Sequence, residues 1–465
     1  MLPVKLTFTA SQHGALLRHL FPPDGCEAVA IALCGRAQSK HRHGLLVHRL
    51  ELVPYSACSV RQPDRVTWPT DILPPLLEEA TKNNWAVAKI HGHRGYDQFS
   101  STDDVSDKAL FPSIYLWTES KSPHISVIVM HDGRALGRVV TAQGHFHAVH
   151  CISVVGDDIK YWYRKDDVPS AIPEHARRIA QTFGAGTYDR LRRLKIAVVG
   201  CSGTGSPVIE QLARNCVGSL VLVDPDRVEA KNLNRILNAT TNDARAKRLK
   251  VKVAERAVRA MGLGTKVKAI GKNLFHPDVI REVASCDVVF GCVDSIDGRY
   301  LLNKLASFYL LPYFDLGVRI DADGKGSVDQ VCGTVHYLRP EGSSLLSRNV
   351  ITLEQVRSAG LQRVDPRQYK KQLKEGYIRG VQEDRPAVIQ LNMLVASMAI
   401  NELLARLHPY RFEPNAQYAI NRVSLSHDIW DHESDGEPCN VLSRHAGRGD
   451  VEPLVEWAEL SGRKS

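Results

Sequence analysis

The chain is organised around a pattern of apolar runs, glycines and a helical repeat between Leu194 and Arg235. An apolar run over residues 196–199 meets three glycines, a helical repeat covers residues 207–214, and a second apolar run ends at Asp224. Apolar runs of this length are typical of buried strands, and the repeat between them is typical of a helix packed on those strands. The stretch therefore predicts a strand, a glycine turn, a helix and a second strand, the βαβ unit of nucleotide-binding folds.

The glycines of this turn have a chemical purpose. Gly200, Gly203 and Gly205 let the backbone turn tightly and let phosphate oxygens approach the N–H groups at the start of the helix. Asp224, at the end of the second strand, is placed to bind a ribose hydroxyl. The spacing is GxxGxG and not the GxGxxG of most dehydrogenases. The glycines alone therefore leave open a dinucleotide-binding fold that uses the same aspartate for NAD.

The first part of the chain mixes short apolar runs with a helical repeat over residues 72–83. This mixture predicts an α+β domain over residues 1–164, ahead of the α/β domain that holds the glycine turn. The expected strands of the first domain cover residues 27–33, 45–53, 86–90, 125–130, 148–155 and 159–163.

Polar stretches divide the rest of the chain. Residues 165–173 are polar and contain prolines, so they predict a linker to a second domain over residues 174–423. Residues 424–465 are polar and predict a C-terminal tail.

Composition narrows the class of protein. The chain has 465 residues, too many for one hydrophobic core, and its hydrophobic share of 43% is that of an ordinary globular protein. It shows neither a long apolar run nor a signal peptide, so we expect a cytoplasmic protein that does not enter a membrane. The excess of 60 Lys and Arg over 51 Asp and Glu is modest and dispersed, which does not favour nucleic-acid binding.

The residues after Asp224 carry a stronger signal than the glycines. The sequence PDRVEAKNLNR, together with the glycine turn, resembles the pattern of the ThiF/MoeB/ubiquitin-activating family of adenylating enzymes. The resemblance runs from about Thr187 to Tyr418 and implies a Rossmann-like fold that binds ATP and Mg²⁺. By this resemblance the nucleotide is held by Gly200, Gly203, Gly205, Asp224, Asn232, Arg235 and Lys250, with Lys247 as the alternative lysine, and Asp294 lies beside Mg²⁺ and the α-phosphate.

The implied chemistry suits these residue types. Attack of a carboxylate at the α-phosphate develops negative charge, which cations and Mg²⁺ spread. Arg235 and Asp294 are therefore expected to be catalytic as well as to bind the nucleotide and its metal.

Two histidines stand at the centre of the first domain, in the sequence AKIHGHRGYDQFSSTDD. His91 and His93 are two residues apart at the end of a predicted strand, so both imidazoles face the same side, as two ligands of one metal ion require. Ser101 and Asp104 follow at the spacing H-x-H-x(7)-S-x-x-D.

This pattern, with Glu27 on an early strand, resembles that of the JAB/JAMM metalloproteases. By resemblance His91, His93 and Asp104 bind Zn²⁺ with a water in the fourth position, Glu27 moves a proton from that water to the leaving amine, and Ser101 steadies the oxyanion. An open three-ligand zinc site lowers the pKa of its water to about 7, which supports this set.

Two departures from the JAB/JAMM pattern leave alternatives open. Arg94 replaces the usual proline after the second histidine, which leaves room for a domain that does not cleave. Counting the loop from Ser100 makes Asp103 the ligand in place of Asp104.

Cysteines are absent between Cys332 and Cys439. This gap covers the expected crossover loop, residues 343–379, where many relatives carry the cysteine that takes the activated protein as a thioester. Cys439, in the predicted tail, is interpreted either as a thioester cysteine on a mobile segment or as a stray surface thiol.

The two resemblances together imply a bifunctional enzyme of a prokaryotic ubiquitin-like modification system. The first domain is expected to cut after the C-terminal glycine of a ubiquitin-like protein, and the second to adenylate that C-terminus with ATP. The implied partners are the ubiquitin-like protein, a conjugating-enzyme-like (E2-like) protein, and a second copy of the chain in a homodimer formed through the adenylation domain. Activation of a sulfur-carrier protein is the alternative enzyme function, and a non-catalytic scaffold that binds a ubiquitin-like protein is the alternative of another class.

Overall fold

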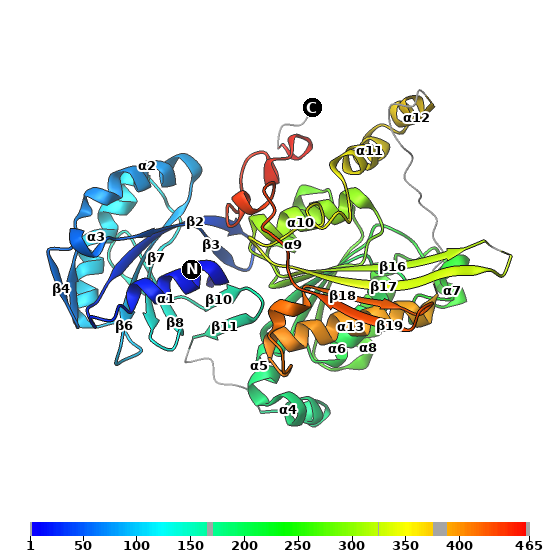
Figure 1. Cartoon of the computed structure of the whole chain (residues 1–465), viewed down its shortest axis with the longest axis horizontal. Helices are drawn as coiled ribbons and strands as arrows, with labels where there is room; N and C mark the ends of the chain where they lie inside the picture. Colours follow the sequence, from blue (N-terminus) through cyan, green and yellow to red (C-terminus); the bar gives the residue numbers. More distant parts are fainter. Residues whose placement is uncertain (1, 165–170, 324, 375–387, 462–465) are drawn as a thin grey trace. The chain divides into compact units, whose positions relative to one another are not determined.

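In a computed structural model the protein is described over residues 2–164, 171–323, 325–374 and 388–461 (Figure 1). The chain divides into two compact units, each built on its own large sheet. Unit 1 comprises residues 1–168, 308–310 and 445–465, and unit 2 comprises residues 169–307 and 311–444.

Unit 1 is built on a mixed nine-stranded sheet. In sheet order its strands are β11 (Ile159–Tyr163), β10 (Cys151–Val155), β1 (Val4–Thr9), β3 (His43–Leu52), β2 (Val29–Gln38), β6 (Ala86–His93), β7 (His124–Met130), β8 (Ala135–Val140) and β9 (Phe146–Ala148). Its helices are α1 (Ala10–Leu20), α2 (Leu73–Asn83) and α3 (Ser101–Thr118), and a separate ribbon joins β4 (Val60–Gln62) to β5 (Arg65–Thr67).

Strand β2 shows why helices lie on both faces of this sheet. Side chains alternate between the two faces of a strand. Ala30 and Ala32 pack into one core with Leu16 of α1, whereas Ile31 and Leu33 pack into another core with residues of α2 and α3. A strand that is apolar on both faces, as the run over residues 28–34 is, therefore has to lie in a central position.

The sheet of unit 2 is parallel at one end and antiparallel at the other. In sheet order its strands are β14 (Lys266–Ile270), β13 (Ser219–Val223), β12 (Lys195–Val199), β15 (Val288–Gly291), β16 (Tyr313–Ala322), β17 (Val328–Leu338), β18 (Ile420–Ser424) and β19 (Ile429–Glu433). The first five are parallel, and β12 pairs with β13 on one side and with β15 on the other. The chain order therefore reverses at β12, and the carboxyl ends of strands at such a point form the usual binding crevice of α/β folds. The predicted α/β, Rossmann-like arrangement is confirmed for this unit.

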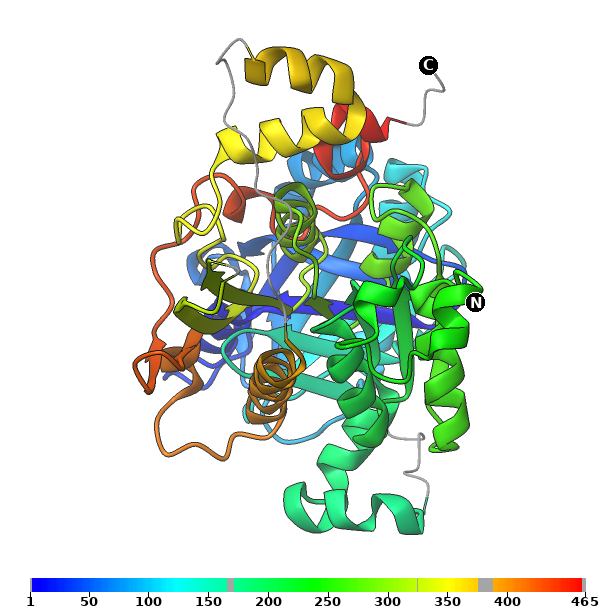
Figure 2. The same cartoon turned by 90° about the vertical axis from the view of Figure 1, so that its right-hand side faces the viewer.

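The helices of unit 2 are α4 (Arg177–Phe183), α5 (Ala185–Arg193), α6 (Gly205–Arg214), α7 (Thr241–Arg245), α8 (Lys250–Met261), α9 (Pro277–Ala284), α10 (Ile296–Phe308), α11 (Leu353–Val364), α12 (Pro366–Lys374) and α13 (Ile389–Leu407). The expected crossover loop, residues 343–379, is largely helical as far as it is described, since it contains α11 and α12. These two helices pack side by side as a pair (Figure 2). Residues 375–379 lie outside the described residues. Within the part of the chain that is described, no helix combines the length and the apolar composition needed to cross a membrane.

The predicted C-terminal tail is instead built into the fold, which corrects that expectation. β18 and β19 extend the sheet of unit 2, and residues 445–465 belong to unit 1. In unit 1, the Asp450 N–H donates to the Arg36 carbonyl at 2.6 Å, and Asp450 Oδ2 accepts a hydrogen bond from the Gln38 N–H at 2.8 Å. Pairing of this kind uses backbone groups that every residue type carries, so a polar composition does not reveal it.

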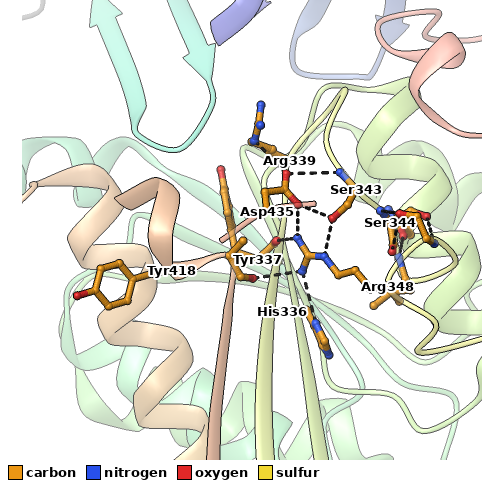
Figure 3. A network of polar contacts seen from close by, with 12 residues as sticks. His336, Tyr337, Arg339, Ser343, Ser344, Arg348, Tyr418 and Asp435 are labelled. Atoms are coloured by element: carbon orange, nitrogen blue, oxygen red, sulfur yellow. Dashed lines mark hydrogen bonds and ion pairs between the residues drawn. The ribbon is translucent and has the colours of Figure 1, made fainter. Parts of the chain in front are cut away.

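A buried polar cluster fixes the segment that follows β19. Figure 3 shows Asp435 meeting Arg348 and Ser343. Arg348 Nη2 lies 2.9 Å from Asp435 Oδ1 and also donates to the Tyr337 carbonyl at 2.9 Å. Burial alone raises the pKa of Asp435, but hydrogen bonds from Ser343 and Arg348 outweigh it and lower that pKa. The charged Asp435 therefore anchors the residues just ahead of Cys439.

Candidate functional site

The glycine turn connects β12 to α6 at the carboxyl end of the parallel strands. Gly200 has a φ of +90°, and a Cβ at Gly200 would collide with the carbonyl group of Cys292. A Cβ at Gly205 would collide with the carbonyl oxygen of Gly200. These two glycines are therefore required by the chain's own backbone. Helix α6 begins without a side-chain cap, and although the Ser206 N–H donates to the Ser202 carbonyl at 2.9 Å and Pro207 has no N–H, the positive end of the helix dipole lies at the turn.

Gly203 is instead covered by side chains. A Cβ built there would lie 2.6 Å from Nδ2 of Asn392 and 3.4 Å from Cδ of Arg235. Arg235 is one of the residues predicted from the sequence, and the structure brings it to the turn. Asn392 is not among the predicted residues, because the apolar repeat of the surrounding helix is typical of packing.

Asp224 directly follows β13 and lies beside the turn. It is 5% exposed, and its two oxygens accept hydrogen bonds from the backbone N–H groups of Cys201 and Asp226, each at 2.8 Å. Burial raises the pKa of Asp224, and the positive charge of Lys250 opposes this. Each carboxylate oxygen retains a lone pair, so Asp224 is able to accept a further hydrogen bond from a ligand hydroxyl.

Of the two candidate lysines, Lys250 is the one that faces the site. It is the first residue of α8, its side chain is buried, and its Nζ lies 2.8 Å from Asp226 Oδ2. Lys247 is exposed. Asp226 was not predicted as a site residue from the sequence. Its position two residues after Asp224 was the available signal, because an aspartate there holds the Lys250 ammonium group in position.

Asn232 and Asp294 complete the predicted nucleotide set. Asn232 is buried, and its Oδ1 accepts a hydrogen bond from the Glu229 N–H at 3.0 Å, so this amide also shapes its own turn. Asp294 is exposed and directly follows Val293, whose Cγ1 would lie 3.2 Å from a Cβ on Gly200. Asp224 directly follows β13 and Asp294 lies three residues after β15, so both residues stand at the edge of the sheet where α/β folds bind ligands.

A second candidate site lies in unit 1, at the end of β6. The Nε2 atoms of His91 and His93 are 3.1 Å apart, and the oxygens of Asp103 lie 2.9 Å from His91 Nε2 and 3.4 Å from His93 Nε2. Among the described residues, these three side chains gather closely enough to hold one metal ion. Ligand atoms of a tetrahedral zinc ion, with bonds of about 2.0–2.1 Å, lie roughly 3.3 Å apart. The donor types and their spacing therefore fit zinc.

The electrostatics of this cluster also suit a metal. Burial lowers the pKa of His91, which favours the neutral imidazole that a metal ion requires. Burial works to raise the pKa of Asp103, but hydrogen bonds with His91 and His93 outweigh it and hold that pKa well below its usual range. Both Nδ1 atoms are buried and lack a hydrogen-bond partner among the described residues, whereas metal-bound histidines usually donate from that nitrogen.

The geometry replaces the predicted ligand Asp104 with its neighbour Asp103. Ser100 is the N-cap of α3, and its hydroxyl is bonded to Asp103, so the helix presents Asp103 to the histidines. Successive residues of a helix point about 100° apart. Asp104 accordingly turns away and pairs with Arg138. Ser101, predicted to steady the oxyanion, is exposed. When Asp103 is the ligand, Ser100 is the serine three residues ahead of it.

Glu27 lies just ahead of β2, where its backbone N–H donates to the Gln62 carbonyl at 2.8 Å. Burial raises the pKa of Glu27 to about 7, and the charges of His93 and Asp103 act on it in opposite directions. Glu27 thus interacts electrostatically with two of the three clustered side chains, and its role as the proton carrier stays a prediction. A carboxyl group with a pKa near neutrality is suited to accept and return a proton.

The cysteines give little support to covalent catalysis. Cys439 is 3% exposed and its N–H donates to the Gly342 carbonyl at 3.0 Å, so it is not the surface thiol that the sequence suggested. Burial, together with the charge of Asp224, raises the pKa of the Cys201 thiol well above its ordinary value. A thiol that does not ionise is a poor nucleophile.

Comparison with known proteins concerns the second half of the chain. A family model described as the ThiF family matches residues 175–435, which is more than half of the sequence. That range contains the glycine turn and excludes the histidine cluster. The resemblance of the first 164 residues to the JAB/JAMM proteins therefore stays a prediction.

Curated relatives match part of the chain. The "Ubiquitin-like modifier-activating enzyme 5" of Aedes aegypti is 26% identical over 216 residues, which cover 44% of this chain and 52% of that protein. The "SAMP-activating enzyme E1" of Haloferax volcanii is 35% identical over 134 residues, covering 29% and 49%. The "Sulfur carrier protein adenylyltransferase" of Thermus thermophilus is 32% identical over 132 residues, covering 28% and 48%. The chain thus spans about half the length of these relatives.

Among solved structures, E. coli MccB with ATP aligns with 58% of this chain and 74% of its own, at 17% identity and a TM-score of 0.43.

Proposed function

This chain belongs to the ThiF family, and from that premise we propose that unit 2 is an E1-like adenylyltransferase. It transfers AMP from ATP to the C-terminal carboxylate of a ubiquitin-like or sulfur-carrier protein and releases pyrophosphate. The relatives support this class of substrate, because their names describe enzymes that activate ubiquitin-like modifiers and an adenylyltransferase for a sulfur-carrier protein.

The observation that carries this proposal is the convergence of charged groups on the glycine turn. Asp224 is bonded to the backbone of the turn through Cys201, and Arg235 lies against Gly203. Asp294 follows the strand that packs against Gly200. A carboxylate for the ribose, a cation for the phosphates and an exposed carboxylate for a metal ion are the groups that nucleotide activation requires.

Each residue then has a defined task. Asp224 orients the ribose, and Arg235 stabilises the negative charge that develops on the phosphate oxygens. Asp294 offers the carboxylate oxygens that Mg²⁺ prefers, and the bound ion supplies positive charge at the phosphates. The test is exchange of labelled pyrophosphate into ATP, with and without candidate ubiquitin-like proteins. Exchange that needs the partner supports adenylation, and binding without exchange points to the non-catalytic scaffold.

We further propose that unit 1 is a zinc peptidase of the JAMM type. His91, His93 and Asp103 are the residues that would hold the ion, which when bound makes a water molecule acidic enough to ionise near neutral pH. Glu27 is placed to accept that proton and to return it to the leaving amine. Its substrate is the peptide bond after the C-terminal glycine of the ubiquitin-like protein.

The two activities suit one pathway, because cleavage after the glycine produces the free carboxylate that adenylation consumes. We place the enzyme in a prokaryotic ubiquitin-like conjugation system, with an E2-like protein as the next carrier and a homodimer formed through unit 2. Sulfur-carrier activation is the second candidate, and the relative from Thermus thermophilus favours it. The absence of cysteine between Cys332 and Cys439 weighs against it, since sulfur transfer usually uses a cysteine in that region.

The identity of the third metal ligand gives a direct test. Asp103→Ala is expected to lower zinc affinity by more than the roughly tenfold to hundredfold cost of disturbing an outer-shell partner. Asp104→Ala is the matched control, one residue away, and is expected to keep its zinc. Zinc content after dialysis against a weak chelator measures both. If only the Asp104→Ala variant loses zinc, Asp104 and not Asp103 is the third metal ligand.

A second test concerns the route of the activated partner. Incubation with ATP and the ubiquitin-like protein, followed by a non-reducing gel, is expected to show no thiol-sensitive adduct. The reason is that Cys439 is buried and that no cysteine lies between it and Cys332. An adduct that disappears in Cys439→Ala would restore a thioester on that residue, and one that persists would implicate Cys332 or Cys201.

A further inference from the structure

Asn392 carries a buried amide group to which the proposed mechanism assigns no role. It lies in the first turns of α13, is 1% exposed, and its Nδ2 is buried without a hydrogen-bond partner among the described residues. Helix α13 packs against α6, the helix that the glycine turn begins (Figure 1). The unpartnered donor is therefore held at the nucleotide end of the parallel sheet.

The nearest feature of the turn is Gly203. A Cβ there would lie 2.6 Å from Nδ2 of Asn392, closer than real Cβ atoms approach, and 3.2 Å from its Cγ, which is a tight contact. Gly200 and Gly205 are required by backbone carbonyls, so Gly203 differs in being required by the Asn392 amide. Arg235 approaches the same glycine with its Cδ. Two nitrogen-bearing side chains thus flank one glycine of the turn.

The buried Nδ2 group of Asn392 lacks a hydrogen-bond acceptor among the described residues. A buried amide N–H without an acceptor loses its bonds to water and gains nothing in return, so native proteins seldom retain one. An oxygen of an anion is the acceptor that the surroundings favour, because the start of α6 and the positive charge of Arg235, whose Nη1 donates to the Lys231 carbonyl at 2.8 Å, both attract negative charge. A leucine, which branches at the same carbon as asparagine, would carry no unsatisfied donor.

We propose that Asn392 donates a hydrogen bond from Nδ2 to a phosphate oxygen of the nucleotide bound on the glycine turn. The inference rests on the proposed nucleotide site of unit 2 and adds to it a ligand from the C-terminal helix. Gly203 is then the position where the chain leaves room for the amide. Binding of the nucleotide in this way also couples the start of α13 to the occupancy of the site.

The test compares ligands that do and do not carry phosphate. Asn392→Leu removes the donor and keeps the bulk of the side chain. We expect its affinity for the ATP analogue AMPCPP, measured by calorimetric titration, to fall at least about tenfold, the usual worth of a hydrogen bond to a charged group. Adenosine, measured in the same way, is expected to bind as it does to the unchanged protein. The thermal midpoint of the free variant should not fall, because an unsatisfied polar group has been removed.

Two further variants keep the outcome decisive. Asn392→Asp has the same shape, and its charge should repel phosphate, so its loss of AMPCPP affinity should exceed that of Asn392→Leu. Asn401→Ala, an exposed asparagine on the same helix, is the matched control and should bind both ligands normally. Unchanged AMPCPP binding by Asn392→Leu and Asn392→Asp, or an equal loss for adenosine, overturns the inference alone. If the unchanged protein binds neither ligand, the proposed nucleotide site fails with it.

Discussion

Glu27→Gln is expected to keep its zinc and to lose at least about a hundredfold in the rate of cleavage after the C-terminal glycine. Glutamine has nearly the same shape as glutamate, but its amide cannot accept the proton that the reaction moves. Burial raises the pKa of Glu27 to about 7, which already marks this carboxyl group as different from an exposed one. Single-turnover cleavage of a ubiquitin-like precursor, with zinc measured on the same samples, tests the expectation.

The control for this variant is Glu78→Gln, an exposed glutamate of α2 in the same unit. It should cleave at the normal rate. Full cleavage by Glu27→Gln with zinc bound would remove Glu27 from the mechanism. Loss of zinc from Glu27→Gln would instead show that the carboxylate helps to hold the metal.

In unit 2, Asp294→Ala and Arg235→Ala are each expected to reduce partner-dependent pyrophosphate exchange by about a hundredfold to a thousandfold, the range seen when one charge-stabilising group is lost. Arg235 lies against the glycine turn, and Asp294 is exposed beside it. Neither residue contributes to the zinc cluster, so the zinc content of both variants should be unchanged.

Helix α9 offers matched controls for these two changes. Asp278 and Arg281 are exposed on that helix, and their alanine variants should exchange pyrophosphate normally. Normal exchange by both Asp294→Ala and Arg235→Ala would place the nucleotide elsewhere or leave unit 2 as a binding domain. Loss of exchange in the controls would show that the assay reports folding rather than chemistry.

Local sequence was sufficient to predict the βαβ unit around the glycine turn. Strand and helix have different periods, and a tight turn between them requires glycine for steric reasons that act within a few residues. The start of α8 at Lys250 and the ends of β13 at Val223 and β15 at Gly291 are equally local. Asp224, which directly follows β13, was therefore identifiable before the fold was known, whereas Asp294, three residues after β15, was identified through the family resemblance.

Other features depend on residues that lie far apart in the sequence. The polar residues from 424 onward are divided between the two units: β19 pairs with β18 in unit 2, and residues 445–465 belong to unit 1, which their composition does not encode. Asn392 reaches Gly203 only because α13 packs on α6, nearly two hundred residues away along the chain. No local pattern distinguishes such an amide from a packing residue.

The sequence by itself determined which kinds of residue form the candidate metal site, but not which of two adjacent aspartates belongs to it. His91 and His93 face one side because alternation along a strand is a local property. The choice of Asp103 over Asp104 depends on the rotation of α3, which the Ser100 cap begins and which the buried pairing of Asp107 with Lys89 and Arg138 holds against the sheet. Turning α3 about its axis by the angle between successive residues, about 100°, would bring Asp104 to the position of Asp103. Only tertiary packing sets the orientation of the helix about its axis.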